Sequence, residues 1–139
     1  MTIQELYFIQ GKRPCQVVGE KGKKQEKMGS NCYLNQLCLT YGSNVLGRRL
    51  FSKQLFPKKR KLPLLVSEHH QSILFPIYGT RNKAALWINH ANIKSVQKQG
   101  MDTSVQFENG MMLVIPVSIV SVQRQMKRCE RILSYLNEL

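Results

Sequence analysis

The segment SVQFENGMMLVIP (residues 104–116) constrains the fold of this chain more than any other stretch. Asn109-Gly110 stands between two apolar runs, and this pair is typical of a two-residue hairpin turn because both of its positions need a positive φ. Such a turn pairs Phe107 with Met112, and side chains alternate between faces from that pair outward. The segment therefore predicts an antiparallel hairpin whose core face carries four side chains, Val105, Phe107, Met112 and Val114.

A helix is predicted after the hairpin, with Pro116 ending the strand and Ser118 as the N-cap of a helix to about Asn137. Apolar residues recur there at helical spacing, at Ile119, Val122, Met126, Cys129, Leu133 and Leu136. The opposite face carries Arg124, Lys127, Arg128 and Arg131. Such a face is typical of the solvated side of a surface helix. The alternatives are a second phosphate-contacting surface and a surface for a membrane or a partner.

The remaining apolar runs predict a set of strands. These lie at residues 6–9, 15–18, 62–66 and 72–78, and residues 84–99 predict one bent strand or two consecutive ones. Residues 19–31 are polar, basic and interrupted by glycines, which predicts a mobile loop. Residues 32–41 predict a further long strand.

A short basic helix is predicted in the middle of the chain, over residues 44–55 with Ser43 as its N-cap. Its helical spacing divides its side chains into two groups. Leu46, Leu50 and Phe51 are expected to face inward, and Arg48, Arg49 and Lys53 are expected to face solvent.

Together these elements predict an α+β fold that is mainly antiparallel β, a small barrel or sandwich. A short central basic helix and a C-terminal amphipathic helix packed on the sheet complete it. The length of 139 residues, with no visible repeat, fits a single domain over residues 1–139.

The charge balance points to a polyanionic partner. Lys and Arg number 21 against 8 acids, a formal net charge of +13, and an excess of this size repels itself in the compact state. Nucleic acid is the expected partner, with an anionic membrane surface or a merely solubilising basic surface as alternatives. The longest apolar run, residues 111–117, is far shorter than the roughly 20 residues of a membrane-spanning helix. The N-terminus lacks the features of a secretory signal, so a cytoplasmic location is expected.

Catalytic and metal-binding patterns are missing from the sequence. The four cysteines, Cys15, Cys32, Cys38 and Cys129, lack zinc-site spacing and are expected to be buried reduced thiols. His69 and His70 are expected in a solvent-exposed turn, His90 in a structural role and Trp87 in the core. We therefore expect no enzyme activity, no cofactor and no metal.

Two basic segments stand out. Residues 41–63, YGSNVLGRRLFSKQLFPKKRKLP, hold seven cationic side chains, and no Asp or Glu occurs between Glu26 and Glu68. Residues 79–83, GTRNK, form a second basic segment that begins with glycine. Glycine permits close approach of the backbone to a phosphate, and arginine presents a flat fork of donors.

Four pieces of the sequence form an ordered series: YGSNVLGRR from Tyr41, LPLLVSEHHQSILFPIYGTRNKAALWINHANIKSV from Leu62, TSVQFENGMMLVIPVS from Thr103, and VQRQMKRCERI after it. This series resembles the ComK family of bacterial competence transcription factors. The resemblance covers roughly residues 41–132, and residues 1–40 match only loosely.

The resemblance implies a cytoplasmic DNA-binding activator of DNA-uptake genes. Such proteins read paired A/T-rich boxes through the minor groove, as dimers that form larger assemblies on double-stranded DNA. RNA polymerase and a proteolytic adaptor are further candidate partners. Longer family members continue into a tail tied to proteolytic control, whereas this sequence stops at Leu139, which weighs against the adaptor.

Minor-groove readout of A/T-rich DNA suits inserted arginines, because the narrow groove has a deepened negative potential. The candidate groove-probing residues are Arg48, Arg49 and Arg81. The candidate phosphate-holding residues are Lys53, Lys58, Lys59, Arg60 and Lys83, with backbone contacts from Thr80 and Asn82.

Two other function classes compete with the DNA hypothesis. An RNA-binding module would need exposed aromatic residues between the basic loops. An interaction protein would use its basic helix to bind an acidic partner or polyanions in general.

The first prediction concerns Arg81. Arg81→Ala should lower affinity most on A/T-rich duplexes, because a narrow groove rewards an inserted arginine. Lys58→Ala should instead weaken binding to all duplexes and reduce the slope of log affinity against log salt by about one unit. Gel shifts over a salt series measure both. An Arg81→Ala protein with unchanged affinity and unchanged A/T preference would contradict the assignment.

Overall fold

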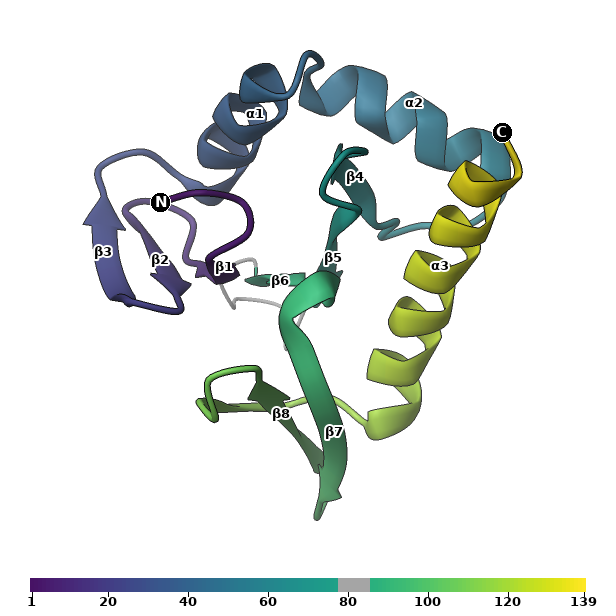
Figure 1. Cartoon of the computed structure of the whole chain (residues 1–139). Helices are drawn as coiled ribbons and strands as arrows, with labels where there is room; N and C mark the ends of the chain where they lie inside the picture. The colour runs from purple at the N-terminus through teal and green to yellow at the C-terminus, as the bar shows by residue number, and fades with distance from the viewer. Residues whose placement is uncertain (78–85) are drawn as a thin grey trace.

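The computed structural model describes residues 1–77 and 86–139. The helices are α1 (Ser30–Thr40), α2 (Val45–Leu55) and α3 (Ile119–Glu138), and a 3-10 turn spans His90–Asn92. The strands are β1 (Leu6–Gln10), β2 (Cys15–Gly19), β3 (Gly22–Glu26), β4 (Leu64–Ser67), β5 (Ser72–Ile77), β6 (Leu86–Asn89), β7 (Ile93–Gln99), β8 (Asp102–Phe107) and β9 (Met112–Ile115). This composition confirms the predicted α+β class, with the C-terminal helix in its predicted place (Figure 1).

Two antiparallel sheets organise the described strands. The larger has six strands in the order β3-β2-β1-β6-β5-β4, and the smaller has three in the order β7-β8-β9. In the described ranges β3 and β4 remain edges of the larger sheet, so the sheets do not close into the barrel offered as one prediction. The predicted segment at residues 84–99 is two strands, β6 and β7, with the turn between them.

Apart from its exposed edge strand β3, the six-stranded sheet is buried on both faces, because its side chains alternate between two hydrophobic clusters. In β5, Ile73 and Phe75 enter one cluster and Leu74 enters the other. The first cluster is covered by α3 and the small sheet. The second is covered by α1 through Leu34 and Cys38. Figure 1 shows α1 and α3 on different sides of the strands.

The predictions for residues 19–41 were wrong. Residues 32–40 belong to helix α1 rather than a strand, and Tyr41 is its C-cap, because Leu34 and Cys38 recur at helical spacing and bury one face against the sheet. Residues 22–26, expected in a mobile loop, form edge strand β3, which is held by backbone pairing with β2 and not by burial of side chains. Cys32 is exposed on α1, unlike the other three thiols, which are buried and free.

Helix α2 forms where predicted but is rotated about its axis. Its N-cap is Asn44 rather than Ser43, with the Asn44 side chain accepting from the Gly47 amide at 2.7 Å. Leu46 and Leu50 are 68% and 56% exposed instead of facing inward. The side of α2 that packs against the rest of the chain carries Ser52, which is fully buried. The Ser52 hydroxyl donates to the Pro63 carbonyl at 2.6 Å.

The hairpin at residues 102–115 forms, but its register differs by one residue from the predicted one. The Phe107 amide donates to the Met111 carbonyl at 2.9 Å, and β9 pairs Val105 with Leu113. The loop therefore has three residues, with positive φ recorded at Gly110 alone of the Asn-Gly pair. A one-residue shift exchanges the faces of β9.

The consequence of this register is that Met112 and Val114 are exposed, while Val105 and Phe107 are buried as predicted. Ile115 replaces them in the core. Phe107 stacks on Tyr7 with ring centroids 4.7 Å apart, which joins the small sheet to strand β1.

Helix α3 matches its prediction closely. The Ser118 hydroxyl accepts from the Ser121 amide at 3.3 Å. Val122, Cys129 and Ile132 are buried, and so is one polar residue, Gln125. Trp87 is buried in β6, as predicted.

The register of β9 generates the second prediction. Ile115→Ala should lower the free energy of unfolding by about 2–5 kcal/mol, since it removes a buried side chain. The neighbouring Val114→Ala should change it by less than about 0.5 kcal/mol, since Val114 is 48% exposed. Urea unfolding followed by circular dichroism measures both. A larger effect for Val114 than for Ile115 would support the two-residue turn instead.

Candidate nucleic-acid interface

A hollow of about 470 Å³ lies where α2, the segment after it and strands β5 and β6 meet. Its lining residues are Arg49, Lys53, Lys59, Arg60, Lys61, Leu62, Pro76 and Trp87. Five of these eight residues are cationic and none is an acid. The structure therefore gathers a large part of the acid-free segment around one concave site.

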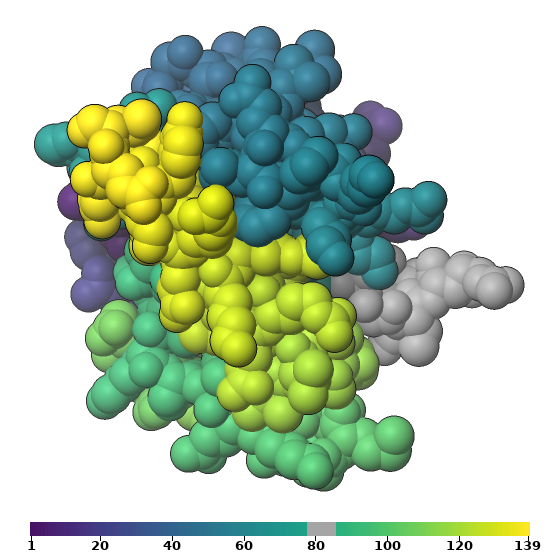
Figure 2. Space-filling model, turned by 90° about the vertical axis from the view of Figure 1, so that its right-hand side faces the viewer, coloured from purple at the N-terminus to yellow at the C-terminus, as the bar shows by residue number. Residues whose placement is uncertain are grey.

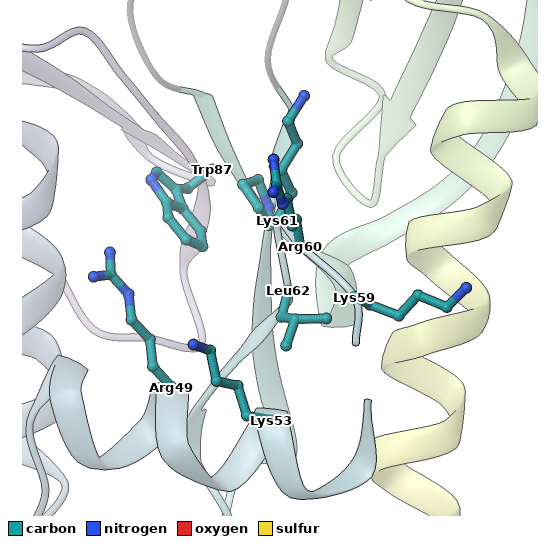
Figure 3. Close-up of a pocket in the computed structure, with 8 residues that line it drawn as sticks. Arg49, Lys53, Lys59, Arg60, Lys61, Leu62 and Trp87 are labelled. Carbon is teal, nitrogen blue, oxygen red and sulfur yellow. The ribbon is translucent and has the colours of Figure 1, made fainter. Parts of the chain in front are cut away.

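Helix α2 supplies two of these cations. Arg49 and Lys53 are four residues apart, so they lie on one helix face. Figure 3 shows both side chains extending from α2 towards Leu62 and Trp87. Two like charges at this spacing repel each other by a few tenths of a kcal/mol, about as much as an opposite pair would gain.

No carboxylate offsets this repulsion in the described part of the chain. The ion pairs recorded there are Lys21–Glu5, Lys24–Glu26 and Arg48–Glu68. None of them involves Arg49 or Lys53, nor Lys59 or Arg60 from the following segment. These four cations are left to an external counter-ion.

The segment after α2 is held in place by side chains of α3. The Gln125 amide donates to the Lys61 carbonyl at 2.7 Å and to the Pro76 carbonyl in β5 at 3.0 Å. The Arg128 guanidinium donates to the Arg60 backbone carbonyl at 3.1 Å and to the side-chain oxygen Oε1 of Gln125, also at 3.1 Å. These bonds fix the backbone, so the side chains of residues 59–61 project from a tethered segment.

A second hollow of about 300 Å³ extends the site along α3. It shares Arg60, Lys61 and Pro76 with the first hollow and adds Ile77, Val117, Ser121, Arg124, Gln125 and Arg128. We call the seven cations of the two hollows the basic face. They are Arg49, Lys53, Lys59, Arg60, Lys61, Arg124 and Arg128. Figure 2 shows α2 and α3 exposed together on one side of the molecule.

The crowding of charge on α3 affects the pKa of Arg128. Partial burial lowers this pKa from its ordinary value, and the nearby positive charge of Arg124 lowers it further. Both effects disfavour the charged guanidinium. An anion bound beside Arg128 would offset the repulsion from Arg124.

Arg48 departs from its prediction. Its side chain is only 11% exposed and its Nη1 lies 3.1 Å from Glu68 Oε1, so it does not face solvent. The helix rotation that exposes Leu46 and Leu50 turns Arg48 inward, next to Cys38. Burial raises the pKa of Cys38, and the charge of Arg48 lowers it by a smaller amount. Arg48 thus ties α2 to the turn between β4 and β5.

The other predicted site residues divide into two groups. Lys58 is exposed on the tethered segment but lines neither hollow. Thr80, Arg81, Asn82 and Lys83 lie outside the described residues. The described chain leaves β5 at Ile77 and resumes at Leu86, next to the hollows, because their lining residues Pro76 and Trp87 pair across the sheet.

Sequence reasoning omitted three kinds of residue from the site. Lys61 belongs to the cationic run itself and was left out. Arg124 and Arg128 were assigned to a solvated helix face, with phosphate contact as the alternative. Helical spacing could have identified Gln125 as a buried polar residue. It lies three positions after Val122 and four before Cys129, on the buried side of α3.

Other kinds of site find little support in residues 1–77 and 86–139. No group of three or more His, Cys, Asp or Glu side chains there is placed to hold a metal. Burial lowers the pKa of His90, which favours the neutral imidazole expected of a structural residue. None of the described helices has the length and apolar character needed to cross a membrane.

Comparison with known proteins gives a consistent answer. The sequence model of the family described as ComK protein matches residues 1–138, well beyond the residues 41–132 that carry the resemblance read from the sequence. A protein named "Competence transcription factor" from Bacillus subtilis (strain 168) is 28% identical over 96 residues. These residues are 68% of this chain and 50% of that protein, so the chain spans about half the length of this relative. No solved structure matches the chain.

The tether from α3 generates the third prediction. Gln125→Met keeps the side-chain size but leaves the Lys61 and Pro76 carbonyls without their donor, which should cost about 1–3 kcal/mol of stability. Gln123→Met, on the exposed side of the same helix, is the matched control and should change stability by less than about 0.5 kcal/mol. Thermal and urea unfolding measure the difference. Equal effects of the two substitutions would show that the tether contributes nothing.

Proposed function

The chain belongs to the ComK family, and on this premise we propose that it is a transcriptional regulator of competence that binds double-stranded DNA. The observation that carries the proposal is the basic face, a continuous set of seven cations lining two adjoining hollows without a carboxylate among them. The name of the Bacillus subtilis relative, a competence transcription factor, supports the biological role.

Duplex DNA supplies counter-charge for the basic face. It carries one negative charge per about 1.7 Å of helix axis, so a surface with several unpaired cations meets several phosphates at once. Lys53, Lys59 and Arg60 are suited to phosphate contacts, since they project from α2 and the tethered segment. Arg124 and Arg128 extend the same contact along α3.

In this proposal the protein recognises A/T-rich DNA through the minor groove. Arg49 stands on an exposed helix face beside the first hollow. Arg81 lies in the sequence between β5 and β6, and both strands contribute a lining residue to that hollow, Pro76 and Trp87. A narrow A/T-rich groove attracts such side chains through its negative potential, without base-specific hydrogen bonds. Thr80, Asn82, Lys83 and Lys58 complete the proposed contacts. Arg48 acts as a positioning residue, because its guanidinium is paired with Glu68.

The chain acts as one domain over residues 1–139, in the cytoplasm, as a dimer or larger assembly on its sites. It acts without enzyme activity and without a metal or cofactor. RNA polymerase is the expected partner in activation.

The alternative of single-stranded RNA binding is less well supported. Base recognition in single strands uses exposed aromatic side chains as stacking platforms. In residues 1–77 and 86–139, the exposed large hydrophobic residues are Met, Leu and Val, and no Phe, Tyr or Trp is among them. The basic face therefore suits a backbone of regularly spaced phosphates better than unstacked bases.

The fourth prediction tests this function by competition. An A/T-rich duplex should displace a labelled promoter fragment at a concentration at least tenfold lower than a G/C-rich duplex or a structured RNA, at equal salt. Arg60→Ala should weaken binding to the A/T-rich duplex and reduce the salt slope by about one unit, since one phosphate contact is lost.

The control for this experiment is Lys98→Ala. Lys98 is an exposed lysine on β7, in the small sheet, and it lines neither hollow. It should leave affinity and salt slope unchanged. Equal displacement by all three competitors would reduce the activity to generic polyanion binding. Equal effects of Arg60→Ala and Lys98→Ala would place the interface elsewhere.

A further inference from the structure

The first hollow has the dimensions and the lining of a small-molecule site. Its volume of about 470 Å³ falls within the range of roughly 300–1,000 Å³ that is usual for ligand pockets. One wall is apolar, made of Leu62, Pro76 and Trp87, and the remaining lining is cationic. A purely electrostatic contact surface for a duplex has no need of a concave apolar wall.

The apolar wall carries an unused hydrogen-bond donor. The Trp87 side chain is 3% exposed, and its indole Nε1 has no hydrogen-bond partner among the described residues. A buried donor without an acceptor destabilises the fold, and buried Trp N–H groups usually find a partner. In Figure 3, Arg49 extends from α2 towards the Trp87 indole, so a cation and this indole border the same hollow.

The cationic part of the lining selects a multiply charged anion. Arg49, Lys53 and Arg60 have no carboxylate among the other lining residues, so their mutual repulsion is relieved only by an added anion. Arginine binds phosphate oxygens through two parallel N–H bonds, which are about twice as strong as neutral hydrogen bonds. A ligand that fits the whole hollow therefore combines a flat, weakly polar ring with more than one phosphate.

We propose that this hollow binds a phosphorylated small molecule of the nucleotide class. The base packs against Leu62, Pro76 and Trp87, the apolar part of the lining. The phosphates pair with Arg49, Lys53 and Arg60. No covalent step is involved, and the ligand binds and leaves unchanged.

Ligand and DNA would then compete for the same cations. The competition rests on the proposed DNA binding, whereas the ligand site itself does not. A bound nucleotide neutralises Arg49, Lys53 and Arg60 and so lowers affinity for the duplex, and the duplex lowers affinity for the nucleotide by the same factor. The level of a charged metabolite would thereby control how much of the protein is free to bind promoters.

The fifth prediction uses the single tryptophan of the chain as a reporter. Magnesium-free ATP and GTP are titrated separately into the full chain at constant ionic strength, and emission of Trp87 is followed, with equilibrium dialysis of radiolabelled nucleotide as a second measurement. At least one of the two nucleotides should bind saturably, at least tenfold more tightly than inorganic triphosphate or adenosine. Arg49→Ala and Arg60→Ala should each weaken binding at least tenfold, and Lys98→Ala should leave it within twofold.

The outcomes separate the two proposals. Absence of saturable binding by both methods would overturn the ligand site, and so would equal affinity for inorganic triphosphate, which would show attraction of anions only. Nucleotide binding by a protein that binds no duplex would leave the site standing and refute the proposed function. Binding of both ligands, with a gel shift that saturating nucleotide does not weaken, would overturn the competition.

Discussion

The attachment of a cationic segment to helix α3 is the interaction on which the rest of this structure depends. Residues 57–61 contain no helix or strand, and repulsion among their side chains favours extension into solvent. Gln125 and Arg128 hold the carbonyls of Lys61 and Arg60, and Ser52 holds that of Pro63. All three contacts are made to backbone atoms. The tether therefore fixes the path of the chain while it leaves the charged ends of the Lys59 and Arg60 side chains without a recorded ion pair among the described residues.

That arrangement keeps positive charge together that an unfolded chain would disperse. The hydrophobic burial on both faces of the six-stranded sheet offsets the repulsion, because α1 and α3 each cover one cluster. The folded protein consequently presents its cations at fixed positions, which reduces the entropy lost on binding an anion. A duplex and a small phosphorylated ligand draw on this same property, and they differ in whether the apolar wall beside Trp87 is used.

Much of the fold was predictable from local patterns. Apolar periodicity predicted the β4, β5, β6 and β7 segments and helix α3, and Ser118 indicated where α3 starts. Errors arose where two periods competed or where one residue decided a register. Residues 32–41 satisfy a helical spacing as well as β propensity, and burial of Leu34 and Cys38 decided for the helix. The Asn-Gly pair indicated a turn correctly, but the three-residue loop that the strands adopt moved Ile115 into the core in place of Met112 and Val114.

The site follows the same division between local and long-range information. By itself the sequence determined that the cations around α2 have no acidic neighbours along the chain between Glu26 and Glu68, and its motifs indicated the family. Only the tertiary structure decided which of those cations meet. It turned Arg48 inward to Glu68, brought Arg124 and Arg128 beside Arg60, and set Trp87 against the hollow. The physical reason is that a helix's rotation and a loop's path depend on contacts between residues far apart in the chain, such as Gln125 with Lys61, which no local pattern records.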